Sequence, residues 1–392
     1  MTLTACAPIL AGVGQGPTAT PEALADVVPP AGELLPPENP PPGATRQFET
    51  DFDRHTVPYD EILSGGPPKD GIPAIDRPKY VSIEEADEWL EPREPVILVE
   101  IEGTARAYPL QILTWHEIVN DTLAGVPVAV TFCPLCNTAI ALRRVVGDGQ
   151  ETTFGTTGRL RYSNLIMYDR LTETWWQQAT GEGIAGEHAG AVLDILPATI
   201  VAWETFVKTH PEADVLSKET GFTRSYGINP YSGYDDIDES PFLFRGPETP
   251  GQLPAMARVL TVELGEEAVA YPFAELEEVR VVNDDMGGRP IVVFWEPGTA
   301  SALDSGIIAQ GRDVGTADTY SRELDGQTLT FTFDGERFLD DQTGTEWTVL
   351  GEAVSGPLEG KELAPVVNVN HFWFSWAAFR PETRIYRPEQ DG

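Results

Sequence analysis

The sequence predicts a mainly β (β-rich α+β) fold with short helices, built as two homologous lobes from an internal tandem duplication. Three observations carry this prediction. The 392 residues include 37 Gly and 34 Pro, which favours strands and turns over long helices. Apolar, β-branched runs such as residues 128–132 are typical of buried strands. Short motifs of the first half recur in the same order in the second, and the chain is long enough for two cores.

The individual elements follow from local signals. Residues 65–73 are rich in Gly and Pro and are predicted to form turns rather than helix or central strand. Ser82, followed three residues later by Glu85, indicates a capped short helix. Residues 96–101 are predicted to form a strand. A second buried strand runs through residues 128–132 and ends at two cysteines.

The internal repeat divides the chain into three parts. The matching pairs are Ala107-Tyr108-Pro109 with Ala270-Tyr271-Pro272, Val119-Asn120-Asp121 with Val282-Asn283-Asp284, Gly125-Val126-Pro127 with Gly288-Arg289-Pro290, and Trp203 with Trp373. Order and spacing persist over most of each half, which is typical of tandem repeats. We therefore expect a tether over residues 1–45, a first lobe over 46–250 and a degenerate second lobe over 251–392.

A duplication lets one half serve as a control for the other. Positions kept in both halves are expected to serve the fold, whereas reactive groups present in one half are candidates for function. The differing pairs are His116 with Val279, Cys133 with Glu296, and His188 with Leu358. Residues 154–169 also form a longer segment than their counterpart 331–341. The sequence thus predicts a site in the first lobe and a chemically silent second lobe.

The N-terminus predicts a membrane anchor. Leu3-Thr4-Ala5 before Cys6 is the small-residue pattern that precedes the lipidated cysteine of bacterial lipoproteins. Residues 12–42 are rich in Pro, Ala, Thr and Glu, which is typical of a tether. We expect an extracytoplasmic lipoprotein, on the cell surface or in the periplasm, attached to the membrane through Cys6. An unmodified N-terminus is the alternative.

The charge of the chain limits its partners. With 62 acidic and 26 basic residues, the formal net charge is −36. Phosphate groups would be repelled at any distance, which argues against a nucleic-acid partner. A solvated acidic surface is the simplest interpretation of this charge.

The first half resembles a family known as DUF3179, a domain of unknown function in bacteria and archaea. Four motifs carry the resemblance: residues 65–76, residues 115–121, Phe132-Cys133-Pro134-Leu135-Cys136, and residues 165–170. Asn137 stands where the family usually has glycine after the second cysteine. The resemblance implies the family but no established activity, so the function has to come from the chemistry of the residues.

The pair Cys133 and Cys136 predicts a site for a soft metal ion, because thiolates bind copper(I) or zinc and this spacing lets both sulfurs reach one ion. His116 and Met167 are the further candidate ligands. Tyr162, Asp169 and His188 are expected around them.

Other uses of the two thiols remain open. They are also suited to dithiol redox chemistry, or one of them to nucleophilic catalysis with His116 as base. The alternative is a non-catalytic cell-surface or scaffold protein in which the cysteines form a structural disulfide. Whether the protein is an enzyme stays open at this stage.

Overall fold

The computed structural model describes residues 32–247 and 251–388, and it is mainly β with a few short helices. Cys6 and most of the expected tether lie outside the described residues. The chain enters through two 3₁₀ turns, two short strands and one short helix. They are η1 (Ala44–Arg46), η2 (Tyr59–Glu61), β1 (Ile62–Ser64), β2 (Tyr80–Val81) and α1 (Ile83–Ala86). The predicted capping box is present, because Ser82 and Glu85 each cap the backbone of the other at the start of α1.

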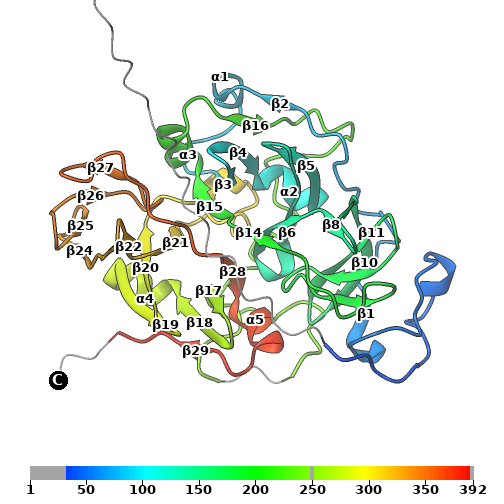
Figure 1. Cartoon of the computed structure of the whole chain (residues 1–392). Coiled ribbons are helices and arrows are strands. Elements are labelled where there is room, and N and C mark those ends of the chain that lie inside the picture. The colour runs from blue at the N-terminus through cyan, green and yellow to red at the C-terminus, as the bar shows by residue number, and fades with distance from the viewer. Residues whose placement is uncertain (1–31, 248–250, 389–392) are drawn as a thin grey trace, which may run out of the picture.

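The first half then runs from residue 95 to residue 216 (Figure 1). Its elements are β3 (Pro95–Ile101), β4 (Thr104–Pro109), α2 (Leu110–His116), β5 (Ile118–Leu123), β6 (Val126–Cys133), η3 (Pro134–Cys136), β7 (Thr138–Arg143), β8 (Val145–Val146), β9 (Gln150–Glu151), β10 (Phe154–Arg161), β11 (Asn164–Asp169), β12 (Trp175–Gln177), β13 (Gly183–Ala185), β14 (Ile195–Leu196), β15 (Thr199–Ala202), α3 (Trp203–Thr209) and β16 (Asp214–Leu216).

The second half runs from residue 258 to residue 385. Its elements are β17 (Arg258–Leu264), β18 (Glu267–Pro272), α4 (Phe273–Val279), β19 (Val281–Met286), β20 (Arg289–Glu296), η4 (Ile308–Gln310), β21 (Thr316–Ser321), β22 (Glu323–Leu324), β23 (Gln327–Thr328), β24 (Phe331–Phe333), β25 (Phe338–Asp340), β26 (Glu346–Trp347), β27 (Ala353–Ser355), β28 (Asn368–Phe372), α5 (Trp373–Phe379) and β29 (Arg384–Ile385).

Strand pairing in the two halves follows the same order. The hairpin β3–β4 pairs with β15 on one side and, in parallel, with β16 on the other. The hairpin β17–β18 pairs in the same way with β28 and β29. The meanders β5–β6–β7 and β19–β20–β21 also correspond. This agreement supports a duplication of the gene, which itself stays a prediction.

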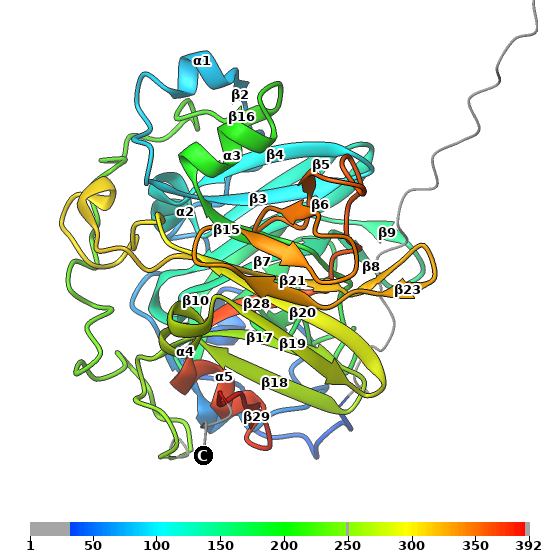
Figure 2. The same cartoon turned by 90° about the vertical axis from the view of Figure 1, so that its left-hand side faces the viewer.

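The two halves do not form separate bodies. Strand β28 of the second half pairs with β7 of the first, so one sheet runs through β29-β18-β17-β28-β7-β6-β5. On the other side, Thr199 of β15 donates a hydrogen bond to Asp318 of β21 at 2.6 Å. Figure 2 shows the two hairpins above and below, with β7, β20, β21 and β28 between them. A boundary near residue 250 therefore separates two repeats in sequence but not two bodies in space.

Each hairpin packs against the meander of the other half. Side chains of both halves therefore contribute to the same hydrophobic core. One apolar cluster joins Val96 and Trp203 of the first half to Phe294 and Trp347 of the second. Burial of large apolar side chains across the junction stabilises the interleaved arrangement. Trp175, Trp176 and Trp373 are buried as well, so they belong to the core rather than to an exposed aromatic surface.

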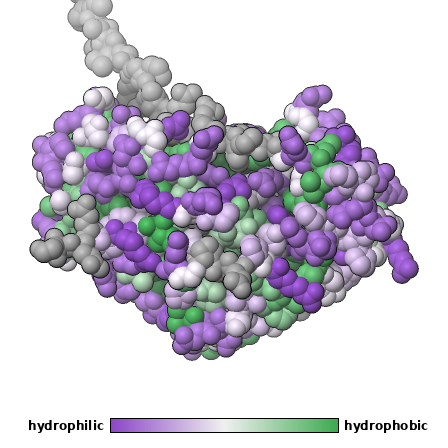
Figure 3. Space-filling model, turned by 90° about the horizontal axis from the view of Figure 1, so that it is seen from below, coloured by the Kyte–Doolittle hydropathy of each residue, from purple (hydrophilic) through white to green (hydrophobic). Residues whose placement is uncertain are grey.

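The surface is mostly polar. The face in Figure 3 is largely hydrophilic, with hydrophobic residues in small separate areas, as expected for a strongly acidic chain. No helix within residues 32–247 and 251–388 is long and apolar enough to cross a membrane.

Candidate thiol site

The two cysteines lie at the sharp connection between two central strands. Strand β6 ends at Cys133, and Pro134 begins the single 3₁₀ turn that ends at Cys136. Asn137 then takes a left-handed conformation with φ 52°, which returns the chain to β7. Asn tolerates this conformation better than most residues, which explains how it stands where the family usually has glycine. Thr138 pairs with Cys133 across the ladder, so the turn closes directly on the thiols.

The sulfur atoms face each other and one carbonyl group. The Sγ atoms of Cys133 and Cys136 are 3.3 Å apart. They lie 3.8 Å and 3.2 Å, respectively, from the carbonyl oxygen of Ser163. Both cysteines are free, and their exposed fractions are 2% and 0%. The site is therefore a buried dithiol.

The carbonyl over the thiols comes from the tip of the longer first-half hairpin. Tyr162 and Ser163 connect β10 to β11 with φ 53° and 64°, a conformation that costs energy for residues other than glycine. The Ser163 hydroxyl donates to the carbonyl of Phe242, which holds the tip in place. The corresponding strands β24 and β25 are three residues each, so the second half has no such long arm. The extra length noted in the sequence thus serves to cover the thiols.

A buried acidic residue, Glu117, is bonded through its backbone to the end of β6, next to Cys133. Glu117 follows the last residue of α2 with φ 59°, and its carbonyl accepts a hydrogen bond from the amide of Phe132 at 2.9 Å. Burial raises the pKa of Glu117 to about 8. The pKa of Cys133 is raised mainly by burial, with smaller contributions from Cys136 and from the charge of Glu117. Burial thus raises the pKa of both the Glu117 carboxyl group and the Cys133 thiol.

A long segment without helices or strands, residues 217–247, covers this site and is called the covering segment here. The hydroxyl of Tyr234 donates to the carbonyl of Leu135, inside the Cys-x-x-Cys turn, at 3.0 Å. The next residue, Asp235, anchors the middle of the segment, because it is buried and paired with Arg258 at 2.6 Å and Arg312 at 2.8 Å. The segment therefore lies over the thiol turn and is held there from both Tyr234 and Asp235.

Sequence reasoning missed a buried amide network behind the turn. The Gln178 amide nitrogen donates to the Thr131 hydroxyl at 2.9 Å and to the Thr138 carbonyl at 3.1 Å. Its oxygen accepts from Asn164 at 2.9 Å. All four side chains are buried, and a satisfied buried network fixes one geometry. The sequence feature that could have indicated this network is the pair Gln177-Gln178, which the second half lacks.

A histidine of the second half also reaches the turn. His371 of β28 is buried, and its Nδ1 lies 2.9 Å from the hydroxyl of Thr138. Burial lowers its pKa to about 3, so the ring is neutral at ordinary pH. The second half therefore supports the thiol turn from behind, while its predicted lack of reactive chemistry stays a prediction.

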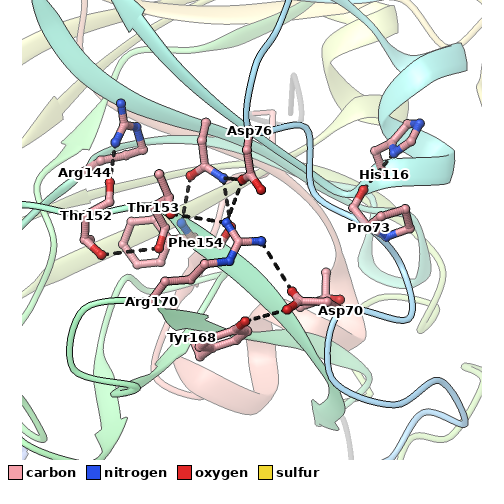
Figure 4. Close-up of polar contacts among 12 residues, drawn as sticks. Asp70, Pro73, Asp76, His116, Arg144, Thr152, Thr153, Phe154, Tyr168 and Arg170 are labelled. Carbon is pink, nitrogen blue, oxygen red and sulfur yellow. Dashed lines mark hydrogen bonds and ion pairs between the residues drawn. The ribbon is translucent and has the colours of Figure 1, made fainter. Parts of the chain in front are cut away.

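The structure does not bring His116 to the thiols. Its Nδ1 lies 2.7 Å from the carbonyl of Pro73, and its Nε2 lies 2.7 Å from the hydroxyl of Tyr226. Figure 4 shows the ring directed at Pro73, away from the cluster of Asp70, Asp76 and Arg170. Both ring nitrogens are used, so the expected role of His116 as a metal ligand is corrected. The next residue, Glu117, has φ 59° and accepts a backbone hydrogen bond from Phe132, the neighbour of Cys133.

The other expected residues fall into two groups. Met167 is fully buried in the same apolar cluster as both cysteines, and Tyr162 adjoins Ser163 at the hairpin tip. Asp169 and His188 lie elsewhere. Asp169 accepts hydrogen bonds from Thr172 and from the indole of Trp176, whereas the His188 ring packs 6.2 Å from that of Trp176.

The equivalent residue of the second half, Asp340, indicates the role of Asp169. Asp340 there accepts the equivalent bonds from Thr343 and Trp347, at 2.6 and 3.1 Å. A residue with the same partners in both halves serves the fold, so Asp169 is corrected from a site residue to a structural one.

The donor atoms near the thiols do not fit a zinc site. Among residues 32–247 and 251–388, no group of three or more His, Cys, Asp or Glu side chains is arranged to hold a metal ion. Two sulfurs on one tetrahedral zinc would lie about 3.8 Å apart, given Zn–S bonds of about 2.3 Å, rather than 3.3 Å.

Comparison with known proteins gives a family and no function. A family described as "Protein of unknown function (DUF3179)" matches residues 69–383, which is most of the chain. No curated protein and no solved structure gives a match.

Proposed function

This chain belongs to the DUF3179 family, and we propose that it is an extracytoplasmic thiol–disulfide protein whose redox centre is the pair Cys133 and Cys136. The single observation that carries the proposal is the 3.3 Å separation of the two sulfurs in a rigid turn. A disulfide needs a sulfur–sulfur distance of about 2.05 Å, so an approach of about 1.2 Å closes the bond.

The proposed reaction is reversible thiol–disulfide exchange rather than formation of a fixed cross-link. In the proposed step, the Cys133 thiol loses its proton and the thiolate attacks a disulfide of a partner molecule, forming a mixed disulfide and releasing one partner thiolate. Cys136 then attacks the sulfur of Cys133, and the second partner thiolate leaves. The Cys133–Cys136 bond has formed, the partner disulfide has received two electrons, and both protons end on the two partner sulfurs.

Glu117 supplies the proton acceptor in this scheme. A carboxyl group with a pKa of about 8 exchanges protons near neutral pH, where an ordinary carboxylate is too weak a base. Its position beside Cys133 suits it to take the thiol proton and to pass it on. The covering segment would have to move first, because the thiols are buried.

A direct test is oxidation of the full chain with a small disulfide such as oxidised glutathione. To remove the third thiol, the experiment uses the Cys6→Ser variant. We expect peptide mass spectrometry to show an intramolecular Cys133–Cys136 disulfide. Reduction should then restore the two thiols. Thiols that stay reduced after the covering segment has been loosened by mild denaturant would contradict it.

Copper(I) binding is the second candidate. It is supported by the two sulfurs on one side of the turn and by the thioether of Met167 in the same apolar cluster, since soft ligands select copper(I). Anaerobic titration with copper(I) against a competing chelator tests it. One ion bound by the wild-type chain but not by the Cys133→Ser/Cys136→Ser variant would favour this candidate.

Attachment to a membrane through Cys6 is also a proposal, supported by the sequence around that residue. Mass spectrometry of the native protein should find Cys6 as the first residue, carrying acyl chains. An intact, unmodified Met1 would rule out the anchor.

A further inference from the structure

In the first half, residues 71–81 fill the outer edge of strand β5. Ile75 forms a parallel bridge with Val119. The amide of Asn120 donates to the Ile75 carbonyl at 2.9 Å, and the Ile75 amide donates to the Ile118 carbonyl at 2.9 Å. The Ile75 side chain is 1% exposed. This segment therefore adds a short extra strand to the sheet.

The same segment continues onto strand β16. Its end, β2, pairs with β16, and the Ser217 amide donates to the Lys79 carbonyl at 2.8 Å. Between the two strands, the Tyr80 hydroxyl donates to Asp121. The segment thus occupies the groove between β5 and β16 over its whole length.

In the second half, no segment of residues 32–247 or 251–388 fills the equivalent groove. A pocket of about 480 Å³ is lined by residues 281–284 of β19 and by residues 384–387 in and after β29. These correspond to residues 118–121 and 214–217, the same residues that hold the segment in the first half. Both β19 and β29 are edge strands of their sheets in the described part of the chain.

One asparagine shows the difference between the two grooves. Asn120 and Asn283 make the same pair of hydrogen bonds, to the backbones of Phe154 and Phe331 respectively, at 2.8 to 2.9 Å. Asn120 also donates to Asp76 at 2.7 Å and is buried. Asn283 is exposed. The fold therefore positions the same side chain in both grooves, while only one groove has an occupant.

We propose that the groove between β19 and β29 binds an extended segment of a partner protein, with an apolar residue followed by an aspartate or glutamate. The apolar residue would take the place of Ile75, and the carboxylate that of Asp76. Addition of a strand to an exposed sheet edge provides backbone hydrogen bonds, and side-chain pockets provide specificity.

Charge favours the same ligand. Arg384 and Arg387 line the groove and are 43% and 48% exposed. Each is paired with one carboxylate at 2.7 Å, Arg384 with Asp284 and Arg387 with Glu275, and each guanidinium has further N–H donors for a ligand. In the first half, Asp214 and Ser217 stand at these positions. The open groove thus carries two arginines that its filled counterpart lacks, which suits the single carboxylate of a ligand at the position of Asp76.

The chain itself supplies the probe for the test. A fluorescent peptide with the sequence of residues 71–81 (GIPAIDRPKYV) should bind the full chain with a stoichiometry of one, measured by anisotropy. A peptide N-methylated at the position of Ile75 cannot donate the hydrogen bond and should bind about tenfold or more weakly. Replacing the aspartate of the peptide by asparagine should also weaken binding.

Two matched variants locate the site. Arg387→Glu should weaken binding about three- to tenfold, because it replaces attraction by repulsion. Arg337→Glu is the control: Arg337 is 47% exposed and paired with a carboxylate at 2.8 Å, but it does not line the groove. Hydrogen exchange should show new protection at Asn283 when the peptide binds. No binding at millimolar peptide, or equal binding of the N-methylated peptide, would overturn the proposal.

Discussion

Replacing Glu117 by glutamine tests the buried acid beside the thiols. Burial raises the pKa of this carboxyl from 4.5 to about 8, so the folded state favours the protonated form. The associated stability is fully present below about pH 4.5 and is lost as the pH rises through about 8. At about 1.4 kcal/mol for each pKa unit, the full loss is about 4 to 5 kcal/mol. The glutamine variant, which does not titrate, should not show this loss.

The assay is urea unfolding of the wild-type chain and the Glu117→Gln variant under reducing conditions at pH 5, 7 and 9. Other buried acids contribute in the same direction, because burial also raises the pKa of Glu94 and Glu352 to about 7. Their contribution is common to both proteins, so the difference between the two isolates Glu117. The wild-type chain should lose about 3 to 4 kcal/mol more than the variant between pH 5 and pH 9.

The control is Glu212→Gln, which changes an exposed carboxylate in the same way. This variant should follow the wild-type curve within about 0.5 kcal/mol at each pH. Parallel curves for the wild-type chain and Glu117→Gln would refute the reasoning, because they would mean that the pKa of Glu117 is not raised in the fold, which leaves its carboxylate too weak a base for the Cys133 thiol.

Three further predictions concern the surroundings of the site. Tyr234→Phe removes the hydrogen bond to Leu135, so alkylation of the thiols should become several-fold faster. The unfolding free energy should fall by only about 1 kcal/mol. An unchanged alkylation rate would argue against control of access by the covering segment. Since burial lowers the pKa of His371 to about 3, the chain should lose stability as the pH falls from 6.5 towards 3, and His371→Gln should reduce this acid sensitivity in urea titrations. Asp169→Asn and Asp340→Asn should each cost about 1 to 3 kcal/mol in unfolding free energy and leave oxidation of the thiols unchanged; a loss of oxidation in Asp169→Asn alone would return that residue to the site.

Local signals in the sequence were sufficient for several elements. The Ser82 cap, strand β3 and the buried strand ending at Cys133 all follow from patterns within a few residues, and the structure has each of them. Such patterns report backbone propensity and the burial of one face, which are local properties. Comparison of the two halves predicted a functional site in the first half, which stays a prediction.

The residues that make up the site were harder to predict. They depend on the direction in which each side chain points and on segments that are distant in sequence. His116 precedes Glu117 directly, yet its ring is bonded to Pro73 and Tyr226, and no pattern in the sequence indicates these partners. His371 and Tyr234 reach the turn from residues far along the chain, and no local pattern announces such contacts. The repeat suggested two lobes, whereas pairing of β28 with β7 interleaves them because edge strands gain hydrogen bonds and buried area by doing so.

The reduction potential of the Cys133–Cys136 pair tests the central claim most directly. Full-length Cys6→Ser protein would be equilibrated with dithiothreitol or glutathione buffers, alkylated, and quantified by mass spectrometry. A reversible two-electron midpoint above about −300 mV is predicted, in the range where protein dithiols exchange with partners. A midpoint well below about −300 mV would indicate a structural disulfide and contradict the proposed redox function.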